Sequence, residues 1–485
     1  MPRKMNKRRL RLQLTFVYTI MVLAVLAIVA VLVLVVQGYR FNRFDGKLEQ
    51  GGLVQFDSQP SGAGVSVDGT LLANKTASKI VLTAGSHHVE MAKDGYTTWK
   101  KDVTVKPGSV LWLNYTLLFP TSPVVTAAAK YTTVTSALAS PNQHVMAAVT
   151  DAATPEIDLT TLNTDTPATT KLTIPSTAYT APTDGATQTF SLVQWDKNSN
   201  LLLVKHDVNG TTEYLSVDTH NADHTVNAST GLGIPIISAA YALNDSNTLY
   251  LLTDNHELRR ANISSMTLTG PLASDVSNFN VTEQNVVTYE TSPDSNDQRI
   301  VGYVSSDSSK AKILSSYTGL GDGTLLATTG SYYGDHYVAI LHGMSLDILQ
   351  GNLPSSDSNA VLALQHVAAL TVAAGGDYVG FSPDNARMIY VAKGNHITTY
   401  DLELNTSATL TLQSPLTRDV QWLDGFHLAV TGHDGYYYDY DGTNGQLFAE
   451  NTLDEPAALG SGSKYLYYFT QGDSEVLLNR VQLTD

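Results

Sequence analysis

Residues 381–404 read FSPDNARMIYVAKGNHITTYDLEL, and this stretch contains the pattern that recurs through most of the chain. Phe381 stands before a polar turn, and a run of apolar and aromatic residues follows it. The turn Lys393-Gly394-Asn395 then leads into a second run over 397–404. Such runs, bounded by Gly, Pro, Asn and Asp, predict short strands. No long helical period appears after residue 40, so the sequence predicts a mainly β protein.

The same unit recurs in weaker form along residues 121–485. Val-Gln-Trp begins two copies, at 193–195 and at 420–422. Other copies begin near Ala139, Tyr241, Phe279, Ser331 and Leu459. The turns fall near residues 142, 198, 245, 284, 334, 384, 424 and 461, which are 37 to 56 residues apart. Since four-stranded propeller blades repeat every ~40–50 residues, the spacing predicts a β-propeller of eight blades, or of seven if one copy is an insertion.

The Ser-Pro-Asp turn with its following strand resembles the TolB-like and WD40-like propellers, a group with six to eight blades. We expect the strand near Tyr131–Ala137 to pair with the last hairpin, 465–469 and 476–481, and so to close the ring. Closure hides the edges of the strands, which protects an exported β protein from edge-to-edge association.

Residues 52–120 show a different β pattern. Val65 and Val67 alternate with polar residues before Asp68-Gly69, a dipeptide typical of type I′ hairpin turns. Further alternating runs lie at 103–105 and 111–117. Several such strands in about 70 residues predict a compact β-sandwich.

The motifs of this segment resemble a PEGA domain. They are Ser58-Gln59-Pro60-Ser61-Gly62-Ala63, Val65-x-Val67-Asp68-Gly69, Ala84-Gly85 with His88 and Val89, and Lys93-x-Gly95-Tyr96-x-x-Trp99. Ser61 replaces the glutamate of the family's name, and Thr76-Ala77 stands where Thr-Pro is common; both are turn positions. The resemblance implies a non-catalytic β module on bacterial extracytoplasmic or envelope proteins, often a spacer or an interaction domain.

Leu14–Val36 is a run of 23 residues without a charge, about 34 Å long as a helix and so able to span a bilayer. Six basic residues and no acidic residue lie within 1–11, which favours a cytoplasmic N-terminus. A cleaved signal peptide is the alternative, but the run is about twice the usual length and no small-x-small site follows it. The sequence therefore predicts a basic cytoplasmic tail (1–13), a signal-anchor helix (14–36), a juxtamembrane linker (37–51) with an aromatic collar at 39–41, and extracytoplasmic domains beyond.

Charge and cysteine content exclude several functions. The net charge is −16, and after residue 11 there are 23 basic against 45 acidic residues, a net of −22. Such a body repels phosphate backbones, so we expect no nucleic-acid partner. The chain has no cysteine, which excludes disulfides, thiol nucleophiles and cysteine-ligated metals.

Motifs for catalysis, cofactors or metals are missing or incomplete. Gly343-Met-Ser345-Leu-Asp347 lacks the second glycine of a nucleophile elbow. His220 and His224 have a metal-like spacing but lie in a polar loop. Asp294-Ser-Asn296-Asp297 and Asp439-x-Asp441-Gly442 offer oxygen ligands that calcium could use, although solvated turns explain both. We expect no catalytic, cofactor-binding or metal-binding residues, and calcium is the one cofactor left open.

The densest aromatic cluster is the one candidate for contact with a ligand or partner. Strand alternation would put Tyr436, Tyr438 and Tyr440 on one face, where they could stack on sugars or peptides. The alternative is that they pack between adjacent blades.

Together these patterns predict a membrane-anchored, non-enzymatic scaffold or binding protein of the cell envelope. Its propeller would be presented to a protein or cell-wall partner. The alternative is an extracellular propeller hydrolase or lyase acting on glycans, which would need carboxylates converging on the channel. A sensor is a third hypothesis and would need a separate signalling partner, because the tail is only about 13 residues long.

Overall fold

A computed structural model of the chain describes residues 7–36, 39–41, 48–282 and 286–484. The chain divides into two compact units, Met1–Ser122 and Pro123–Asp485. The predicted tail residues 1–6, part of the predicted linker (37–38 and 42–47) and the turn predicted at 284 lie outside the described residues.

The first unit begins with helix α1 (Lys7–Val36). Within it, the 21 residues Leu14–Leu34 are long and apolar enough to cross a membrane. None of this window is buried against the rest of the chain, and Phe16 is 66% exposed. The helix is therefore not a core element of either unit, in agreement with the predicted span.

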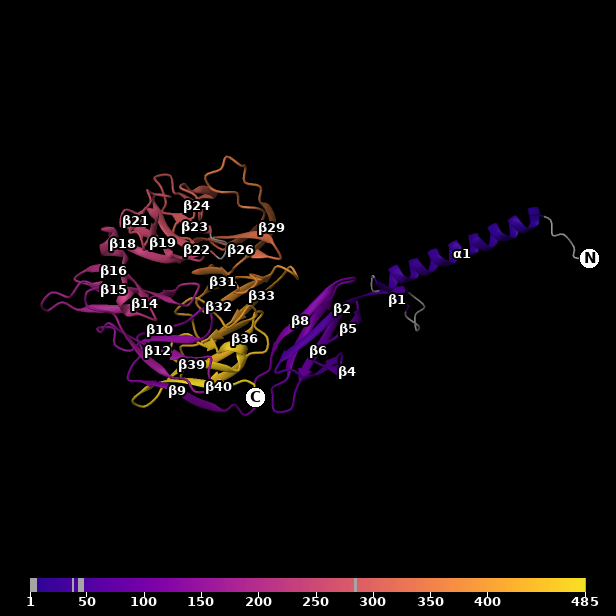
Figure 1. Cartoon of the computed structure of the whole chain (residues 1–485), viewed down its shortest axis with the longest axis horizontal. Helices are drawn as coiled ribbons and strands as arrows, with labels where there is room; N and C mark the ends of the chain where they lie inside the picture. The colour runs from indigo at the N-terminus through magenta and orange to yellow at the C-terminus, as the bar shows by residue number, and fades with distance from the viewer. Residues whose placement is uncertain (1–6, 37–38, 42–47, 283–285, 485) are drawn as a thin grey trace, which may run out of the picture. The chain divides into compact units, whose positions relative to one another are not determined.

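Two four-stranded sheets form the β-sandwich of the first unit (Figure 1). One sheet contains β1 (Tyr39–Phe41), β2 (Leu48–Gln59), β5 (Ser78–Thr83) and β8 (Val110–Leu117). The other contains β3 (Gly64–Val67), β4 (Thr70–Lys75), β6 (Gly85–Ala92) and β7 (Trp99–Val105). Tyr39 pairs with Gln50, so part of the segment predicted as a linker and aromatic collar is a strand pair.

The predicted hairpin turn and aromatic core are both present in this sandwich. Asp68 and Gly69 have φ values of 50° and 77° between β3 and β4, as a type I′ turn requires. Trp99 is 2% exposed and packs edge-to-face on Tyr115 at a centroid distance of 6.1 Å. Such large side chains supply much of the core of a small domain without disulfides.

In its described residues, the second unit contains eight four-stranded antiparallel sheets. Seven are formed by consecutive strands, and the eighth combines the last three strands with β9. We call them blades 1 to 8 in chain order, which confirms the predicted number. Blade 1 contains β10 (Ser136–Ala139), β11 (Val145–Val149), β12 (Glu156–Thr161) and β13 (Thr169–Thr173), and blade 2 contains β14 (Gln188–Trp195), β15 (Leu201–Val208), β16 (Thr211–Asp218) and β17 (Val226–Asn227). Blade 3 contains β18 (Ile236–Ala242), β19 (Asp245–Thr253), β20 (Leu258–Asn262) and β21 (Thr267–Leu268). Blade 4 contains β22 (Val276–Val281), β23 (Val286–Thr291), β24 (Gln298–Ser305) and β25 (Lys312–Thr318).

The other four blades follow the same order. Blade 5 contains β26 (Leu325–Tyr332), β27 (Asp335–His342), β28 (Ser345–Gln350) and β29 (Gln365–Thr371), and blade 6 contains β30 (Tyr378–Phe381), β31 (Met388–Lys393), β32 (His396–Asp401) and β33 (Thr406–Thr411). Blade 7 contains β34 (Gln421–Trp422), β35 (His427–Val430), β36 (Gly435–Asp439) and β37 (Gln446–Ala449). Blade 8 contains β38 (Ala458–Leu459), β39 (Tyr465–Gln471), β40 (Val476–Gln482) and β9 (Val125–Tyr131). Short helical turns η1 (Ala222–His224), α2 (Ala228–Leu232) and η2 (Ser461–Ser463) lie in connections.

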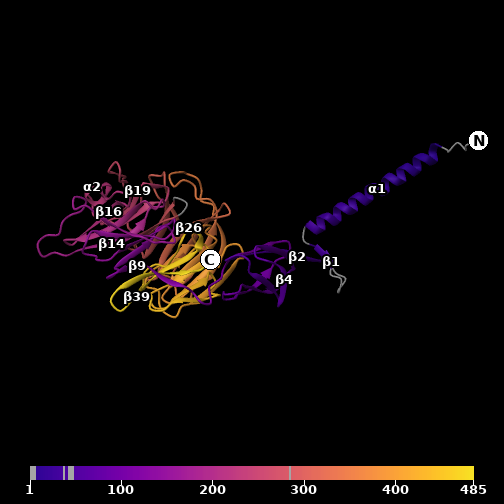
Figure 2. The ribbon, with the colours of Figure 1, turned by 60° about the horizontal axis from the view of Figure 1, so that its bottom comes forward.

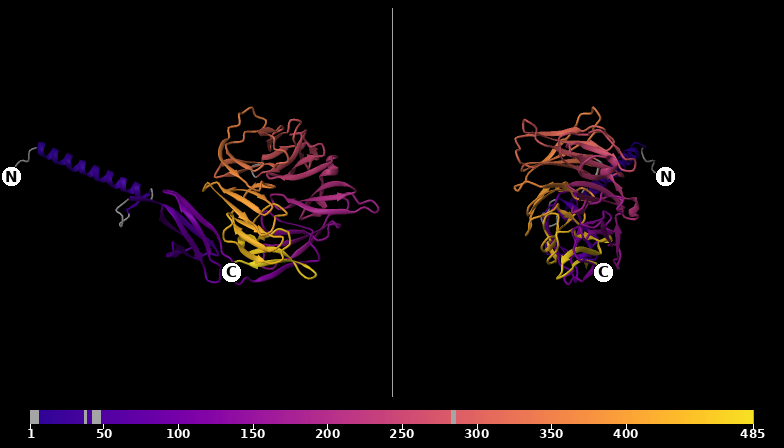
Figure 3. Two further views of the ribbon diagram at one scale, coloured as in Figure 1. Left: turned by 180° about the vertical axis from the view of Figure 1, so that it is seen from behind. Right: turned by 90° about the vertical axis from the view of Figure 1, so that its left-hand side faces the viewer.

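The first strand of the unit completes the last blade. β9 pairs antiparallel with β40, with Tyr131 opposite Val476 and Val125 opposite Val481. Figures 2 and 3 show this purple strand beside the yellow strands of blade 8. The predicted closure by the last hairpin is confirmed. The predicted closing strand, 131–137, is wrong, because β9 ends at Tyr131 and residues 136–139 already belong to blade 1.

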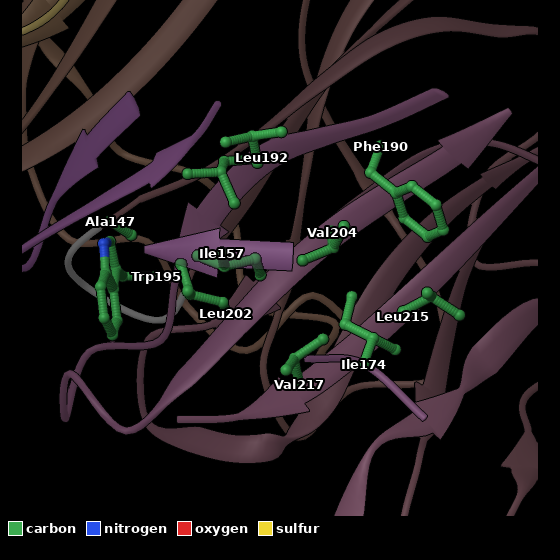
Figure 4. Packing of buried hydrophobic residues seen from close by; sticks show 11 residues of the cluster. Ala147, Ile157, Ile174, Phe190, Leu192, Trp195, Leu202, Val204, Leu215 and Val217 are labelled. Atoms are coloured by element: carbon green, nitrogen blue, oxygen red, sulfur yellow. The ribbon is translucent and has the colours of Figure 1, made fainter. Parts of the chain in front are cut away.

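Hydrophobic clusters hold neighbouring blades together. The cluster between blades 1 and 2 contains Ile157, Phe190 and Trp195 (Figure 4). Similar clusters lie at the interfaces 2–3, 3–4, 4–5, 5–6, 6–7 and 8–1. At the interface of blades 7 and 8, Phe448 packs against Tyr468 with ring centroids 5.0 Å apart. The ring therefore has a hydrophobic contact at every interface, which stabilises it without disulfides.

Polar side chains also link neighbouring blades through backbone N–H groups. Gln194 Oε1 accepts from the N–H of Tyr241 at 2.9 Å, and Gln421 Oε1 accepts from that of Ala457 at 2.9 Å. These are the two glutamines of the Val-Gln-Trp copies. Each bond satisfies a backbone donor of the next blade, in its first strand at Tyr241 and directly before its first strand at Ala457.

Candidate functional site

The turns between the first and second strands of the blades surround a cavity of about 840 Å³. Its lining comes from blades 1, 2, 3, 6, 7 and 8. Turns from six blades of one ring can line one cavity only at the middle of one face, so the cavity is the mouth of the central channel. Its volume is in the range of small-molecule sites.

Four of the six cavity turns, those of blades 1, 2, 6 and 7, are shaped by an oxygen-bearing side chain. Asp196 Oδ1 accepts from the N–H groups of Asn200 and Leu201, both at 2.7 Å. Asp424 Oδ1 accepts from those of Phe426 and His427, both at 2.8 Å. Ser140 and Ser382 accept from backbone N–H groups in the corresponding turns. Such bonds favour turns over continued strands. They explain why Asp or Ser recurs at this position of the repeat.

Apolar groups dominate the wall of the cavity. They are Leu138, Ala139, Pro141, Val193, Trp195, Leu243, Pro383, Trp422, Leu423, Ala457, Ala458 and Leu459. The two tryptophans of the Val-Gln-Trp copies differ. The Nε1–H of Trp195 donates to the Leu138 carbonyl at 3.2 Å. The indole nitrogen of Trp422 is buried and has no hydrogen-bond partner among the residues that the structure describes.

A glutamine links two of the turns that line the cavity. Gln143 has a φ of 60°, an uncommon conformation for a residue other than glycine. Its Nε2 donates to the carbonyl of Leu423 at 3.1 Å. Gln143 belongs to blade 1 and Leu423 to blade 7, so the bond passes over blade 8. It fixes the relative positions of two turns that line the cavity.

The charged groups of the wall fall into two classes. Asp424 is engaged: His427 Nδ1 lies 2.7 Å from its Oδ2. Burial raises the pKa of this carboxyl, but the His427 ring and the two backbone donors outweigh burial and hold the pKa below its ordinary value. Lys197 and Asp384 are exposed lining residues, and neither forms a hydrogen bond or ion pair with another described residue.

A buried ionic network lies beside the cavity turns of blades 6 and 7. Arg387 is 4% exposed and forms two hydrogen bonds with Asp401, at 3.0 and 2.7 Å. Its Nη1 lies 2.7 Å from Glu403, which also accepts from the hydroxyl of Tyr332 in blade 5. The guanidinium lies 5.5 Å from the Phe426 ring centroid in blade 7. The network thus joins three consecutive blades.

The tyrosines that the sequence singled out do not line the cavity. Tyr436 and Tyr438 are half-buried and stack at a centroid distance of 5.8 Å. Tyr438 also packs against the cluster between blades 6 and 7. Tyr440 is 6% exposed and lies against Phe426. The prediction of a shared contact face is wrong for Tyr440, because it is buried, and the alternative of packing describes Tyr438.

The residues considered for metals are engaged in turns or in separate pairs. Asp294 Oδ1 accepts from two backbone N–H groups of its own turn. His220 and His224 both face Asp218, at 3.8 and 3.4 Å. No group of three or more His, Asp or Glu side chains is placed to hold a metal within the described ranges. His87 and His88 pair with different carboxylates, Asp68 and Asp102, each at 2.7 Å.

The sequence analysis missed one buried acid. Glu290 lies in β23, where every residue is buried, and its Oε1 accepts from the N–H of Ala327 in blade 5 at 2.6 Å. Burial raises the pKa of Glu290 to about 8, although the bond from Ala327 acts in the opposite direction. A single acid within the run of β-branched and aromatic residues 286–291 was the available signal.

Solved β-propeller structures and one family model resemble parts of this chain. The structure resembles the β-propeller domain of Myceliophteria thermophila Cps50 (Swd1), with 10% sequence identity and a TM-score of 0.42 over 75% of this chain and 99% of that chain. It also resembles Saccharomyces cerevisiae Sqt1, with 12% identity and a TM-score of 0.44 over 74% of this chain and 97% of that chain. An oligogalacturonate lyase in complex with manganese matches with 11% sequence identity and a TM-score of 0.41, over 63% of this chain and 96% of that chain. These likenesses concern the fold alone. No curated protein matches the chain.

Residues 52–118 match the PEGA domain family. The chain therefore contains a PEGA domain and a β-propeller, together with one apolar helix long enough to cross a membrane. This combination fits an extracellular or surface-anchored propeller protein.

Proposed function

We propose that this protein is a membrane-anchored, non-enzymatic binding protein of the cell envelope. In this proposal α1 is an uncleaved anchor with its basic end in the cytoplasm. The PEGA domain and the propeller work outside the membrane, and the propeller binds a protein or cell-wall partner through the cavity in its channel mouth.

The character of the cavity wall carries this proposal. A glycan hydrolase would need two carboxylates placed across a substrate, one with a raised pKa. The described wall has two carboxylates, Asp384 and Asp424. Asp424 has a lowered pKa and is bonded to its own turn, so it does not match the acid of such a pair. The remaining wall is mostly apolar, which suits binding by burial of apolar surface.

The test of binding uses the full chain in lipid nanodiscs, incubated with purified cell wall and, separately, with envelope proteins of the source organism. Val193 and Val367 are both 36% exposed, but only Val193 lines the cavity. We expect retention of wall material or of one protein, lost in Val193→Trp and kept in Val367→Trp. Equal retention by both variants would show that the cavity is not the binding site. Cleavage of wall glycans would establish the enzyme instead.

The direction of insertion can be tested because the chain has no cysteine. Single substitutions Asn6→Cys, before the helix, and Asp184→Cys, in an exposed loop of the propeller, provide unique labelling sites. We expect a membrane-impermeant maleimide to label Asp184→Cys on intact cells and Asn6→Cys only after lysis. The reverse pattern would contradict the proposed topology.

A further inference from the structure

The cavity wall carries one free cation and one free anion, on opposite sides of the ring. Lys197 belongs to blade 2 and Asp384 to blade 6. In a ring of eight blades these two positions are half a turn apart in either direction. Both side chains are exposed, and neither has a hydrogen-bond or ion-pair partner among the described residues.

The surroundings keep these two charges apart. Between them, the wall is formed by apolar side chains, including Trp195, Trp422 and Leu459. The other charged lining group, Asp424, is paired with His427. A ligand that fits has a positive group at one end, a negative group at the other and apolar groups between them.

Resting on the proposed function, we propose that the cavity binds a short peptide with free termini. Its carboxylate lies against Lys197, its ammonium group lies against Asp384, and its side chains contact the apolar wall. An unmodified peptide is the common chemistry that carries both charges and an apolar middle. A neutral oligosaccharide would leave both charges of the wall without a partner, and burying an unpaired charge disfavours binding.

The length of the peptide is also part of the inference. An extended peptide spans about 3.3–3.6 Å per residue, so only certain lengths allow both termini to reach their charges. Affinity for a series from dialanine to pentaalanine should therefore pass through a maximum. A monotonic rise with length would indicate non-specific apolar binding and would overturn the proposal.

The test is calorimetric titration of the full chain in nanodiscs with the best peptide of this series and its capped forms. We expect N-acetylation and C-amidation each to weaken binding by on the order of fivefold, as for a solvent-accessible charge pair. Lys197→Gln should weaken binding of the free peptide by a similar factor, with no effect on the C-amidated form. Asp384→Asn should also weaken binding of the free peptide by a similar factor, because it removes the partner of the ammonium group. It should have no effect on binding of the N-acetylated form.

Controls separate this inference from the proposed function. Lys310→Gln and Asp322→Asn change exposed charges outside the cavity lining and should leave peptide affinity unchanged. If a wall or protein partner is retained in a cavity-dependent way, but free peptides neither bind nor compete, then the peptide inference fails and the proposed function stands. If capped and free peptides bind equally, the two charges play no part and the inference fails. If N-acetylated peptide binds as tightly as free peptide, the ligand is a carboxyl terminus alone and the paired recognition is wrong.

Discussion

Arg387 shows how a single residue joins several blades. Its guanidinium is bonded to Asp401, which is 1% exposed, and lies against Glu403. Burial disfavours the charged form, but the two carboxylates outweigh burial and raise the pKa of Arg387. Removing this cation would leave a buried carboxylate without its countercharge, which costs more than the pair itself contributes.

We therefore expect Arg387→Leu to lower the free energy of unfolding of the propeller by roughly 3–5 kcal/mol. Lys171 is the matched control, because it forms an exposed ion pair with Glu156 at 2.7 Å, and exposed pairs contribute little to stability since water and salt screen them. Chemical denaturation of both variants measures the difference. A loss no larger for Arg387→Leu than for Lys171→Leu would show that the network does not stabilise the ring.

Glu290 links protonation to stability. In the unfolded chain a glutamate loses its proton near its ordinary pKa of 4.5, whereas in the folded chain the pKa is about 8. Between these values the folded state holds the additional proton. Its stabilising contribution is complete below pH 4.5 and is lost as the pH rises toward 8, by about tenfold in the folding equilibrium per pH unit.

The substitution Glu290→Gln should remove this slope. The amide stays neutral at all pH values, and its oxygen can still accept from the Ala327 N–H. We expect the unfolding midpoint of the unsubstituted chain to decrease as the pH is raised from 5 to 8. The midpoint of Glu290→Gln should decrease less over the same range. Glu156→Gln, in an exposed pair, should retain the full slope. Parallel slopes for all three proteins would exclude Glu290 as the source.

At the scale of elements, the polar turns were the most predictable feature. Of the eight turns predicted from the sequence, seven lie at or beside the connection between the first and second strands of a blade, and the eighth, at 284, lies outside the described residues. Asp196, Ser382 and Asp424 explain this success, because each fixes a turn through bonds to its own backbone. Local chemistry of this kind is legible in sequence.

The closing strand was less predictable because its residues are atypical of strands. β9 reads VTAAAKY, and alanine and lysine are depleted in strands. Its pairing is decided by β40, more than 340 residues later. The sequence placed the strand six residues too late, since Tyr131 was its only clear aromatic signal.

Tyr131 anchors the closing strand in the interface between blades 8 and 1. It is 6% exposed, belongs to the cluster of Met146 and Phe469, and its hydroxyl lies 2.7 Å from Thr160 Oγ1. We expect Tyr131→Ala to cost about 3–5 kcal/mol, as for other buried aromatic residues. Tyr131→Phe should cost only about 0.5–1.5 kcal/mol, because Thr160 keeps its contact with Thr169.

Limited proteolysis at 123–131 reports whether the loss is local. In Tyr131→Ala this segment should be cut faster than in Tyr131→Phe, before the other blades are cut. Uniform cleavage of all blades would contradict a local role for the closing strand.

At the scale of the whole molecule, the charge is concentrated in the propeller. Residues 123–485 contain 14 Lys and Arg against 38 Asp and Glu, a net of 14 − 38 = −24. Residues 1–122 contain 15 against 7, a net of +8. Like charges on one compact body repel one another and lower its stability.

We expect the melting temperature of the propeller to rise when sodium chloride is increased from 10 to 150 mM, since salt screens this repulsion. The triple variant Asp184→Asn, Asp322→Asn and Asp473→Asn neutralises exposed acids. It should melt higher than the unsubstituted chain at 10 mM salt, by a margin that shrinks at 150 mM. A margin that does not depend on salt would indicate a cause other than repulsion.

The cavity could not be predicted from the sequence. Its wall combines residues from Leu138 to Leu459, and no local pattern records which turns meet around a channel. In its own segment, Lys197 has the pattern of an ordinary solvent-exposed lysine. Its proposed part in binding depends on Asp384 of blade 6, which lies across the ring. The aromatic cluster at 436–440 was conspicuous in sequence because aromatic residues build interfaces between blades as well as binding surfaces.

The closing strand also imposes an order on synthesis. β9 leaves the ribosome before every other strand of the propeller, but its partner β40 is the last of the described propeller strands to emerge. During translation of the intervening blades, β9 has an unpaired edge, and the ring stays open until the final hairpin arrives. A chain that stops before residue 476 would lack the strand that pairs with β9. The ring therefore cannot close until residues 476–481 have been made, although β9 is the first of its strands to be synthesised.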